Sequence, residues 1–393
     1  MRSPCWSFSL ASMLLLAGAC QGPAESRTTE SSEAIALPVA ALVRVPFEVD
    51  LGGWTSRAEL LHPPADGPFG PGPYPVVLLI HGNGPHDMDC TLPGPGGKVA
   101  LFAEIAEALA ARGLAVVRYD KRFVKGPGRF DARFWRGQST LQFTEDAATV
   151  LDAARSLPQC MGQRSILNGW SEGTAVAAAL AARRDDVVAL VLQGPVGLPY
   201  REMVRSWIEE VGVAYAQGPD GGPVTAKKLT AAQRGAGGAV AKLGASLLCE
   251  PAAFGAPLAV SSRIDRNGDG ELDPATEIAP AIDAIVDYCF SPTGNCYIYA
   301  EGRTVPPATA QAGALRMPVL ILQGENDAST PLRSGEALAA ALAAAGNAEV
   351  TLRRLPGLGH TLGPAASRQD DCGRAPDPAV LREMAGWVAQ RAH

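Results

Sequence analysis

A serine flanked by glycines is the first feature with a chemical meaning. Residues Gly169-Trp170-Ser171-Glu172-Gly173 match the pattern G-x-S-x-G. In that pattern the serine lies on a sharp turn between a strand and a helix, where side chains at the glycine positions would clash. A predicted short strand, 165–168, precedes the motif, and an Ala-rich helix, 174–184, follows it. This context predicts a nucleophile at the positive end of a helix.

A serine hydroxyl needs a base before it becomes a useful nucleophile. Beside the terminal His393 and His62 in an early hairpin, the chain offers His81, His86 and His360. His360 follows a Gly-rich loop after a predicted strand near 349–354, and it is the predicted base. The alternative is an ordinary histidine in a surface loop.

The predicted acid lies in the loop after a buried strand, 319–323. Asp327 would orient the imidazole and stabilise its charged form. Glu325 is a substitute in the same loop, and a turn aspartate bonded to its own backbone is the alternative without catalysis. The chain order is therefore Ser171, Asp327, His360.

Backbone donors complete the predicted site. The loop His81-Gly82-Asn83-Gly84-Pro85 follows the apolar strand 76–80, and it can aim the N–H of Asn83 at a carbonyl oxygen. The N–H of Glu172 would be the second donor of this oxyanion hole. His81 is expected to shape the loop and is not predicted to be a base.

The elements that must position these residues alternate between strand and helix. Residues 40–62 predict an antiparallel hairpin, and the strands 76–80, 115–119, 165–168, 187–192 and 319–323 alternate with helices at 99–112, 141–157, 174–184, 334–345 and 378–391. Such alternation predicts an α/β fold with a mostly parallel, doubly wound sheet.

The alternation is lost between Pro199 and Met317, where an amphipathic helix near 200–215 is followed by Gly-rich segments. We expect this insertion to be a lid over the carboxyl edge of the sheet. The predicted organisation is a signal peptide at 1–19, a tether at 20–36, a core at 37–198, the lid at 199–316 and the rest of the core at 317–393.

The N-terminus resembles an export signal. Arg2 precedes an apolar stretch, Phe8 to Ala19, that is too short to span a bilayer. Leu16-Ala17-Gly18-Ala19-Cys20 resembles the lipobox of bacterial lipoproteins, and the resemblance implies lipidation of Cys20. The alternative is ordinary cleavage near Ala19. The protein is expected to be exported, periplasmic or at the cell surface, with a lipid anchor in the membrane.

Composition limits the partners. The 393 residues are 47% hydrophobic and 19% charged, as in a globular protein, with a formal charge of −6. A mildly acidic chain without basic runs is not expected to bind nucleic acid. After the signal, an even number of cysteines predicts disulfides in an exported protein, with Cys289–Cys296 as the first pair expected. The six are Cys90, Cys160, Cys249, Cys289, Cys296 and Cys372.

Taken together, the motifs resemble bacterial α/β-hydrolases, in the serine-esterase group of EstD-type carboxylesterases. The resemblance covers about 75–200 and 317–391. It is carried by the segments beginning at His81, Arg118, Gly169, Asp327 and His360. It implies carboxylic-ester hydrolysis by a Ser–Asp–His triad in the chain order of that fold, without a cofactor. The chain differs from the pattern at Asn83, where serine is usual, and at Phe123, where glycine is usual.

An acidic loop inside the insertion resembles the start of a calcium loop. Asp265, Asn267 and Asp269 occupy positions 1, 3 and 5, with Gly270 at position 6 and Glu271 following. Position 12 is Thr276 where glutamate is expected. The alternatives are a structural calcium ion and a solvated turn rich in Asp and Asn.

Three functions fit this sequence. The first is an esterase acting on small-molecule esters. The second is a peptidase or acyl-aminoacyl hydrolase, since the same triad serves both chemistries. The third is a binding protein on a hydrolase scaffold, which the complete triad disfavours.

Overall fold

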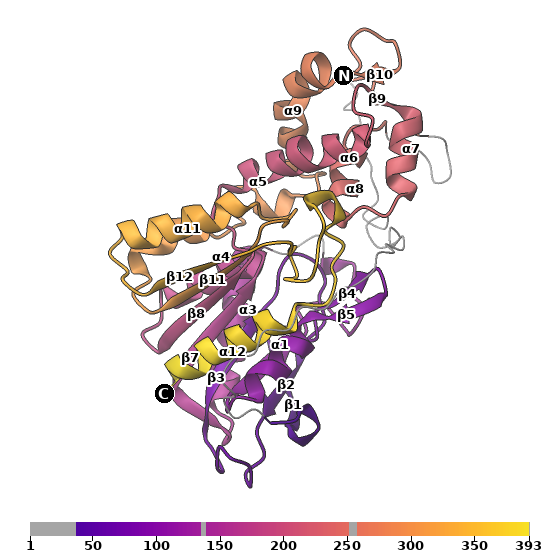
Figure 1. The fold of residues 1–393 in the computed structure, drawn as a ribbon. Coiled ribbons are helices and arrows are strands. Elements are labelled where there is room, and N and C mark those ends of the chain that lie inside the picture. Colours follow the sequence, from indigo (N-terminus) through magenta and orange to yellow (C-terminus); the bar gives the residue numbers. More distant parts are fainter. Residues whose placement is uncertain (1–36, 135–138, 251–257, 393) are drawn as a thin grey trace.

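The computed structural model describes residues 37–134, 139–250 and 258–392. One sheet runs through it in the strand order β1-β2-β6-β3-β7-β8-β11-β12 (Figure 1). The first two pairings are antiparallel and the other five are parallel. The strands are β1 (Val43–Asp50), β2 (Thr55–His62), β3 (Tyr74–Ile80), β6 (Ala115–Tyr119), β7 (Cys160–Trp170), β8 (Val187–Gln193), β11 (Val319–Gly324) and β12 (Val350–Leu355).

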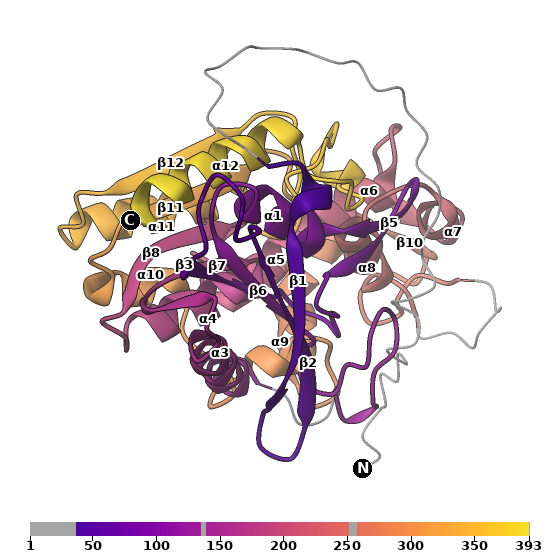
Figure 2. The ribbon, with the colours of Figure 1, turned by 90° about the horizontal axis from the view of Figure 1, so that it is seen from below.

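The central strands are apolar on both faces because helices cover both. All residues of β3 and β6 are buried. One face packs on α1 (Leu101–Ala110) and α12 (Pro378–Ala392). The other packs on α3 (Thr140–Arg155), α4 (Glu172–Ala181) and α11 (Leu332–Ala344). Figure 2 shows the two layers on opposite sides of the sheet. The predicted α/β fold with a mostly parallel, doubly wound sheet is confirmed.

Several elements differ from the sequence expectation. A short hairpin of β4 (Thr91–Gly94) and β5 (Gly97–Ala100) lies where the sequence predicted no strand, and it overlaps the start of the helix predicted at 99–112. The predicted strand at 165–168 is longer and begins at Cys160. Four-residue strands that contain Pro and Gly lack the alternation that marks a strand.

The segment between β8 and β11 is largely helical. The expected helix near 200–215 is present as three consecutive pieces, and further short elements follow that the sequence did not predict. The pieces are α5 (Tyr200–Ser206), a π-helical segment (Trp207–Gly212) and α6 (Val213–Gln217). The others include β9 (Val224–Thr225), α7 (Ala226–Arg234), α8 (Ala239–Ser246), β10 (Glu271–Leu272), α9 (Ala279–Phe290) and α10 (Ala308–Gln311).

The two ends of this segment meet. The N–H of Ala308 donates to the carbonyl oxygen of Val196 at 2.9 Å, and the Thr309 hydroxyl donates to that of Gly197 at 3.0 Å. Further along, Trp207 Nε1 donates to the carbonyl oxygen of Ser329 at 2.7 Å. The insertion therefore leaves and rejoins the core at one place and contacts the loop after β11.

The predicted signal peptide, tether and Cys20 lie outside the described residues, as does His393. In the part of the chain that is described, no helix combines the length and the apolar character needed to cross a membrane. None of the six cysteines there forms a disulfide in this structure, so the expected pairings are not seen. The backbone N–H of Cys296 nevertheless donates to the carbonyl oxygen of Cys289 at 2.8 Å, and a disulfide between the two residues stays a prediction.

Candidate active site

Ser171 lies on the strained turn that the motif predicts. Its φ of 57° and ψ of −127° place a non-glycine residue in a rarely occupied conformation between β7 and α4. Its N–H donates to the carbonyl oxygen of Gln193 at 2.9 Å. The side chain is partly exposed, whereas every residue of α4 is buried. The fold therefore presents one hydroxyl at the N-terminus of a buried helix.

The glycines of the motif are required by close backbone approach. A Cβ atom on Gly169 would lie 2.4 Å from the carbonyl oxygen of Gly173, and one on Gly173 would lie 2.2 Å from that of Ile80. A Cβ atom on Gly82 would lie 2.8 Å from the Cβ of Ser171. These contacts hold the serine turn against the end of β3.

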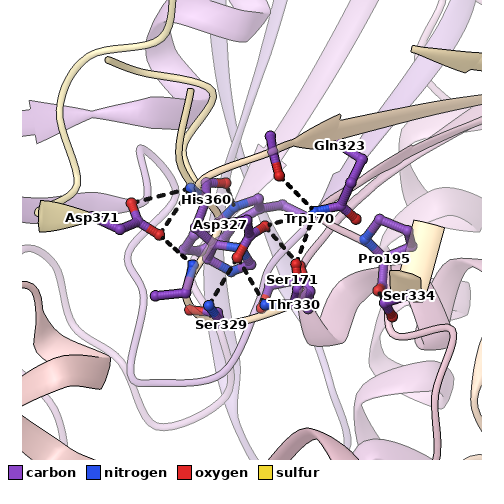
Figure 3. Close-up of polar contacts among 12 residues, drawn as sticks. Trp170, Ser171, Pro195, Gln323, Asp327, Ser329, Thr330, Ser334, His360 and Asp371 are labelled. Atoms are coloured by element: carbon purple, nitrogen blue, oxygen red, sulfur yellow. Dashed lines mark hydrogen bonds and ion pairs between the residues drawn. The ribbon is translucent and has the colours of Figure 1, made fainter. Parts of the chain in front are cut away.

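His360 and Asp327 form a direct pair. His360 Nδ1 donates to Asp327 Oδ2 at 2.8 Å (Figure 3). This bond assigns the proton to Nδ1 and leaves the Nε2 lone pair free to accept a proton. Asp327 is fully buried, whereas Glu325 in the same loop is exposed. Of the two acids considered, Asp327 is therefore the one that orients the imidazole.

The Asp327 carboxylate is fixed by its own loop. Oδ1 accepts the N–H groups of Ser329 at 2.8 Å and Thr330 at 2.7 Å, and Oδ2 accepts the Thr330 hydroxyl at 2.7 Å. Gln323 Nε2, at the end of β11, lies 3.3 Å from Oδ2. These donors hold the carboxylate in place beside the imidazole.

Trp170 links the serine turn to the histidine loop. Trp170 Nε1 donates to the carbonyl oxygen of His360 at 3.0 Å, and the two ring centroids are 5.1 Å apart. Both Ser171 and His360 lie within the described chain, and no hydrogen bond joins their side chains there. Hydrogen bonds of this kind often tighten only when substrate is bound.

A second carboxylate, which the sequence did not predict, supports the pair. Asp371 accepts the backbone N–H of His360 at 3.1 Å and that of Ala328 at 3.0 Å. It thus ties the loop of the acid to the loop of the base. Burial, followed by the charge of Asp327, raises the pKa of Asp371 to about 6.

The electrostatics favour a charged imidazole. Burial lowers the pKa of His360, but the charge and hydrogen bond of Asp327 and the charge of Asp371 outweigh it. The pKa of His360 is therefore raised above its usual value. By contrast, burial holds the pKa of His81 well below its usual range, and His81 Nε2 donates to the carbonyl oxygen of Asp87 at 3.0 Å. His81 thus holds the loop after β3 in shape.

The two predicted oxyanion-hole residues are joined through their side chains. Asn83 is exposed, and its Nδ2 donates to Glu172 Oε2 at 3.3 Å and to the hydroxyl of Tyr299 at 2.5 Å. Glu172 is buried and lies 3.3 Å from the Nζ of Lys121. The sequence did not predict a role for Tyr299, which lies in the insertion. Nor did it predict one for Lys121, although Lys121 belongs to the segment beginning at Arg118 that carries the family resemblance.

The predicted calcium loop is held by its own backbone. Asp265 accepts the N–H groups of Gly268 and Gly270, and Asp269 accepts that of Glu271 at 2.9 Å. Asn267 Oδ1 accepts the N–H of Asp269 at 2.8 Å. Across the described ranges, no group of three or more His, Cys, Asp or Glu side chains is arranged to hold a metal ion. Calcium binding stays a prediction.

Two family models match this chain. The model described as serine aminopeptidase, S33, matches residues 76–220, and the one described as TAP-like protein matches 285–375. Together with the sheet order and the turn at Ser171, these matches support the α/β-hydrolase fold.

The individual proteins that the chain resembles share little sequence identity with it. The esterase EstD of Thermotoga maritima is 28% identical over 153 residues, which are 37% of this chain and 34% of that protein. The chain thus aligns with about a third of the length of this relative. Among solved structures, the proline iminopeptidase of Mycobacterium smegmatis has a TM-score of 0.50 at 17% identity, covering 89% of this chain and 98% of that one. The acylaminoacyl peptidase of Pyrococcus horikoshii has a TM-score of 0.50 at 12% identity, covering 89% and 42%. The two structures share the fold.

Proposed function

We propose that the protein is a serine hydrolase that cleaves carboxylic esters through an acyl-enzyme on Ser171. The observation that carries the proposal is the hydrogen bond between His360 and the buried Asp327, beside the strained turn that presents Ser171. The similarity to an esterase supports an ester as the substrate.

The reaction follows from the placement of these groups. Ser171 Oγ attacks the ester carbonyl while His360 Nε2 takes its proton, and Asp327 stabilises the resulting imidazolium. The N–H groups of Asn83 and Glu172 receive the negative oxygen of the tetrahedral intermediate. Collapse expels the alcohol, which takes the proton from His360. Water then repeats the sequence on the acyl group and releases the acid, and no cofactor is needed.

Replacement of the nucleophile tests the proposal. Ser171→Ala should lower kcat on p-nitrophenyl acyl esters by at least about 10⁴-fold, because the remaining groups cannot form the acyl-enzyme. Circular dichroism should show an unchanged fold. Labelling by a fluorophosphonate should be lost in the same variant, and unchanged turnover would disprove the role of Ser171.

A peptidase is the second candidate. It is favoured by the match of residues 76–220 to the model described as serine aminopeptidase. The same acyl-enzyme forms from an amide, so the pocket decides between the two. A panel of p-nitrophenyl esters and aminoacyl p-nitroanilides separates them by the ratio of kcat/KM values. Turnover of the anilides at rates comparable to the esters would favour the peptidase.

We further propose that the protein is exported and anchored by a lipid at Cys20, facing the periplasm or the cell surface. The apolar stretch and the small residues before Cys20 support this proposal. Metabolic labelling with palmitate should mark the wild type and disappear in Cys20→Ala. Equal labelling of both would contradict the anchor.

A further inference from the structure

A buried lysine contacts the peptide group that would form the oxyanion hole. Lys121 lies two residues beyond the end of β6, and its side chain is 4% exposed. Its Nζ donates to the carbonyl oxygen of Gly82 at 2.8 Å and lies 3.3 Å from Glu172 Oε1. It also lies 3.8 Å from the ring centroid of Phe143. A desolvated ammonium group is thus held against the loop after β3.

The carbonyl group that Lys121 contacts and the N–H of Asn83 belong to the same peptide unit. That unit is planar, and its C=O and N–H point in opposite directions in the trans form. A donor that fixes the carbonyl oxygen therefore also fixes the direction of the N–H. A cation on the oxygen polarises the peptide, which makes the N–H a stronger donor in a site of low dielectric.

The Glu172 carboxylate completes the arrangement. Its Oε1 faces Lys121, and its Oε2 accepts from the side chain of Asn83 at 3.3 Å. The Lys121 ammonium group therefore contacts both Glu172, the residue after the nucleophile, and the Gly82–Asn83 peptide. Burial lowers the pKa of Lys121, and the charge of Glu172 opposes that effect.

We propose that Lys121 is a positioning residue of the oxyanion hole, which orients and polarises the Gly82–Asn83 peptide so that its N–H receives the negative oxygen of the transition state. This role rests on the proposed serine-hydrolase function. A purely structural ion pair with Glu172 would stabilise the fold without a specific effect on the transition state.

Lys121→Met tests the role because methionine keeps an unbranched chain against Phe143 and removes the donor. We expect kcat on a p-nitrophenyl ester to fall about tenfold, less than the 10²–10³-fold that follows the loss of an oxyanion donor. KM should stay within about twofold. Affinity for phenylboronic acid, which forms a tetrahedral adduct with the serine, should fall by the same factor as kcat.

Arg122→Met is the matched control. Arg122 is the next residue, and its guanidinium group pairs with Asp146 at 2.5 Å and donates to the carbonyl oxygen of Gly52 at 3.1 Å. Its loss should lower the melting temperature and leave kcat and boronate affinity within about twofold of the wild type. A tenfold loss of kcat here as well would reduce the role of Lys121 to stability.

A double variant separates polarisation from the effect of an unpaired carboxylate. Lys121→Met with Glu172→Gln removes both charges of this ion pair, so it also serves if the single variant does not fold. The role predicts that the double variant stays about tenfold slow. Recovery of the wild-type kcat would assign the loss to the stranded carboxylate and overturn the proposal.

The outcomes also separate this role from the proposed function. A wild type without ester turnover and without boronate affinity would disprove the hydrolase itself. An active wild type matched by Lys121→Met in kcat and boronate affinity would disprove only the role of Lys121.

Discussion

The charge on Asp327 sets the pH at which His360 can act as a base. Neutral imidazole is the active form, so activity should rise as pH increases through the pKa of His360. Since Asp327 and Asp371 raise this pKa, the acid limb of kcat/KM should lie above the ordinary value of about 6.5.

Asp327→Asn should move this acid limb to lower pH, because the variant removes the charge that stabilises the imidazolium. The plateau rate should fall by about 10⁴-fold, as expected when the base loses its orienting acid. A pH profile of kcat/KM measures both effects. Glu325→Gln is the control in the same loop, and a shifted limb in that variant instead would show that the acid was wrongly assigned.

Individual residues also show where prediction from sequence ends. Ser171, Asp327 and His360 could be proposed because each follows a predicted strand at the same sheet edge. Asp371 and Tyr299 could not, since Asp371 also contacts Ala328, 43 residues away, and Tyr299 contacts Asn83, 216 residues away. No local spacing marks such a contact.

At the scale of elements, the turn after β8 controls the space beside the pair of His360 and Asp327. Gly194 has a φ of +52°, and a Cβ atom there would lie 2.8 Å from His360 Nδ1 and 2.9 Å from Asp327 Oδ2. Its N–H donates to the carbonyl oxygen of Leu322 in β11 at 2.9 Å. This hydrogen bond ties the turn to β11 of the sheet.

Gly194→Ala should displace the imidazole and lower kcat by about 10²-fold, the cost of a misplacement of about 1 Å. Gly52→Ala is the matched control, because Gly52 also has a positive φ, +75°, but nothing lies within 4 Å of an added Cβ. It should cost only about 1–2 kcal/mol of stability. Equal kcat values for the two variants would contradict this argument.

The elements themselves were predicted well where their pattern is strong. The strand Ala115–Tyr119 has the predicted bounds, because a continuous apolar run is typical of a strand between two helical layers. Within the insertion, the helix near 200–215 was predicted and the short helices after it were not. Helices α7 and α8 of the insertion are short and flanked by glycines, so their apolar positions form no long periodic pattern.

Phe123 has a φ of 67°, which explains why the family that this chain resembles has glycine at that position.

For the molecule as a whole, the acidic loop offers a test that is independent of catalysis. β10 pairs with β9, and Figure 1 shows both at the end of the insertion far from the main sheet. Calcium bound at Asp265, Asn267 and Asp269 would stabilise this end of the molecule.

A chelator should therefore lower the melting temperature of the wild type, added calcium should restore it, and ester turnover at 25 °C should stay unchanged. Asp265→Asn should abolish the response to both. A melting temperature that does not change on chelation would exclude a structural calcium ion.

The meeting of Val196 with Ala308 has a consequence for how such proteins diversify. The two ends of this inserted segment meet at the same point of the core. The whole segment can therefore be exchanged in evolution while the sheet and its loops are inherited unchanged. Further attachments constrain the exchange, because Tyr299 contacts Asn83, Trp207 contacts Ser329 and Glu210 pairs with Arg333 and Arg368. A new insertion could thus bring a new choice of substrate, provided that it also brought partners for these core residues.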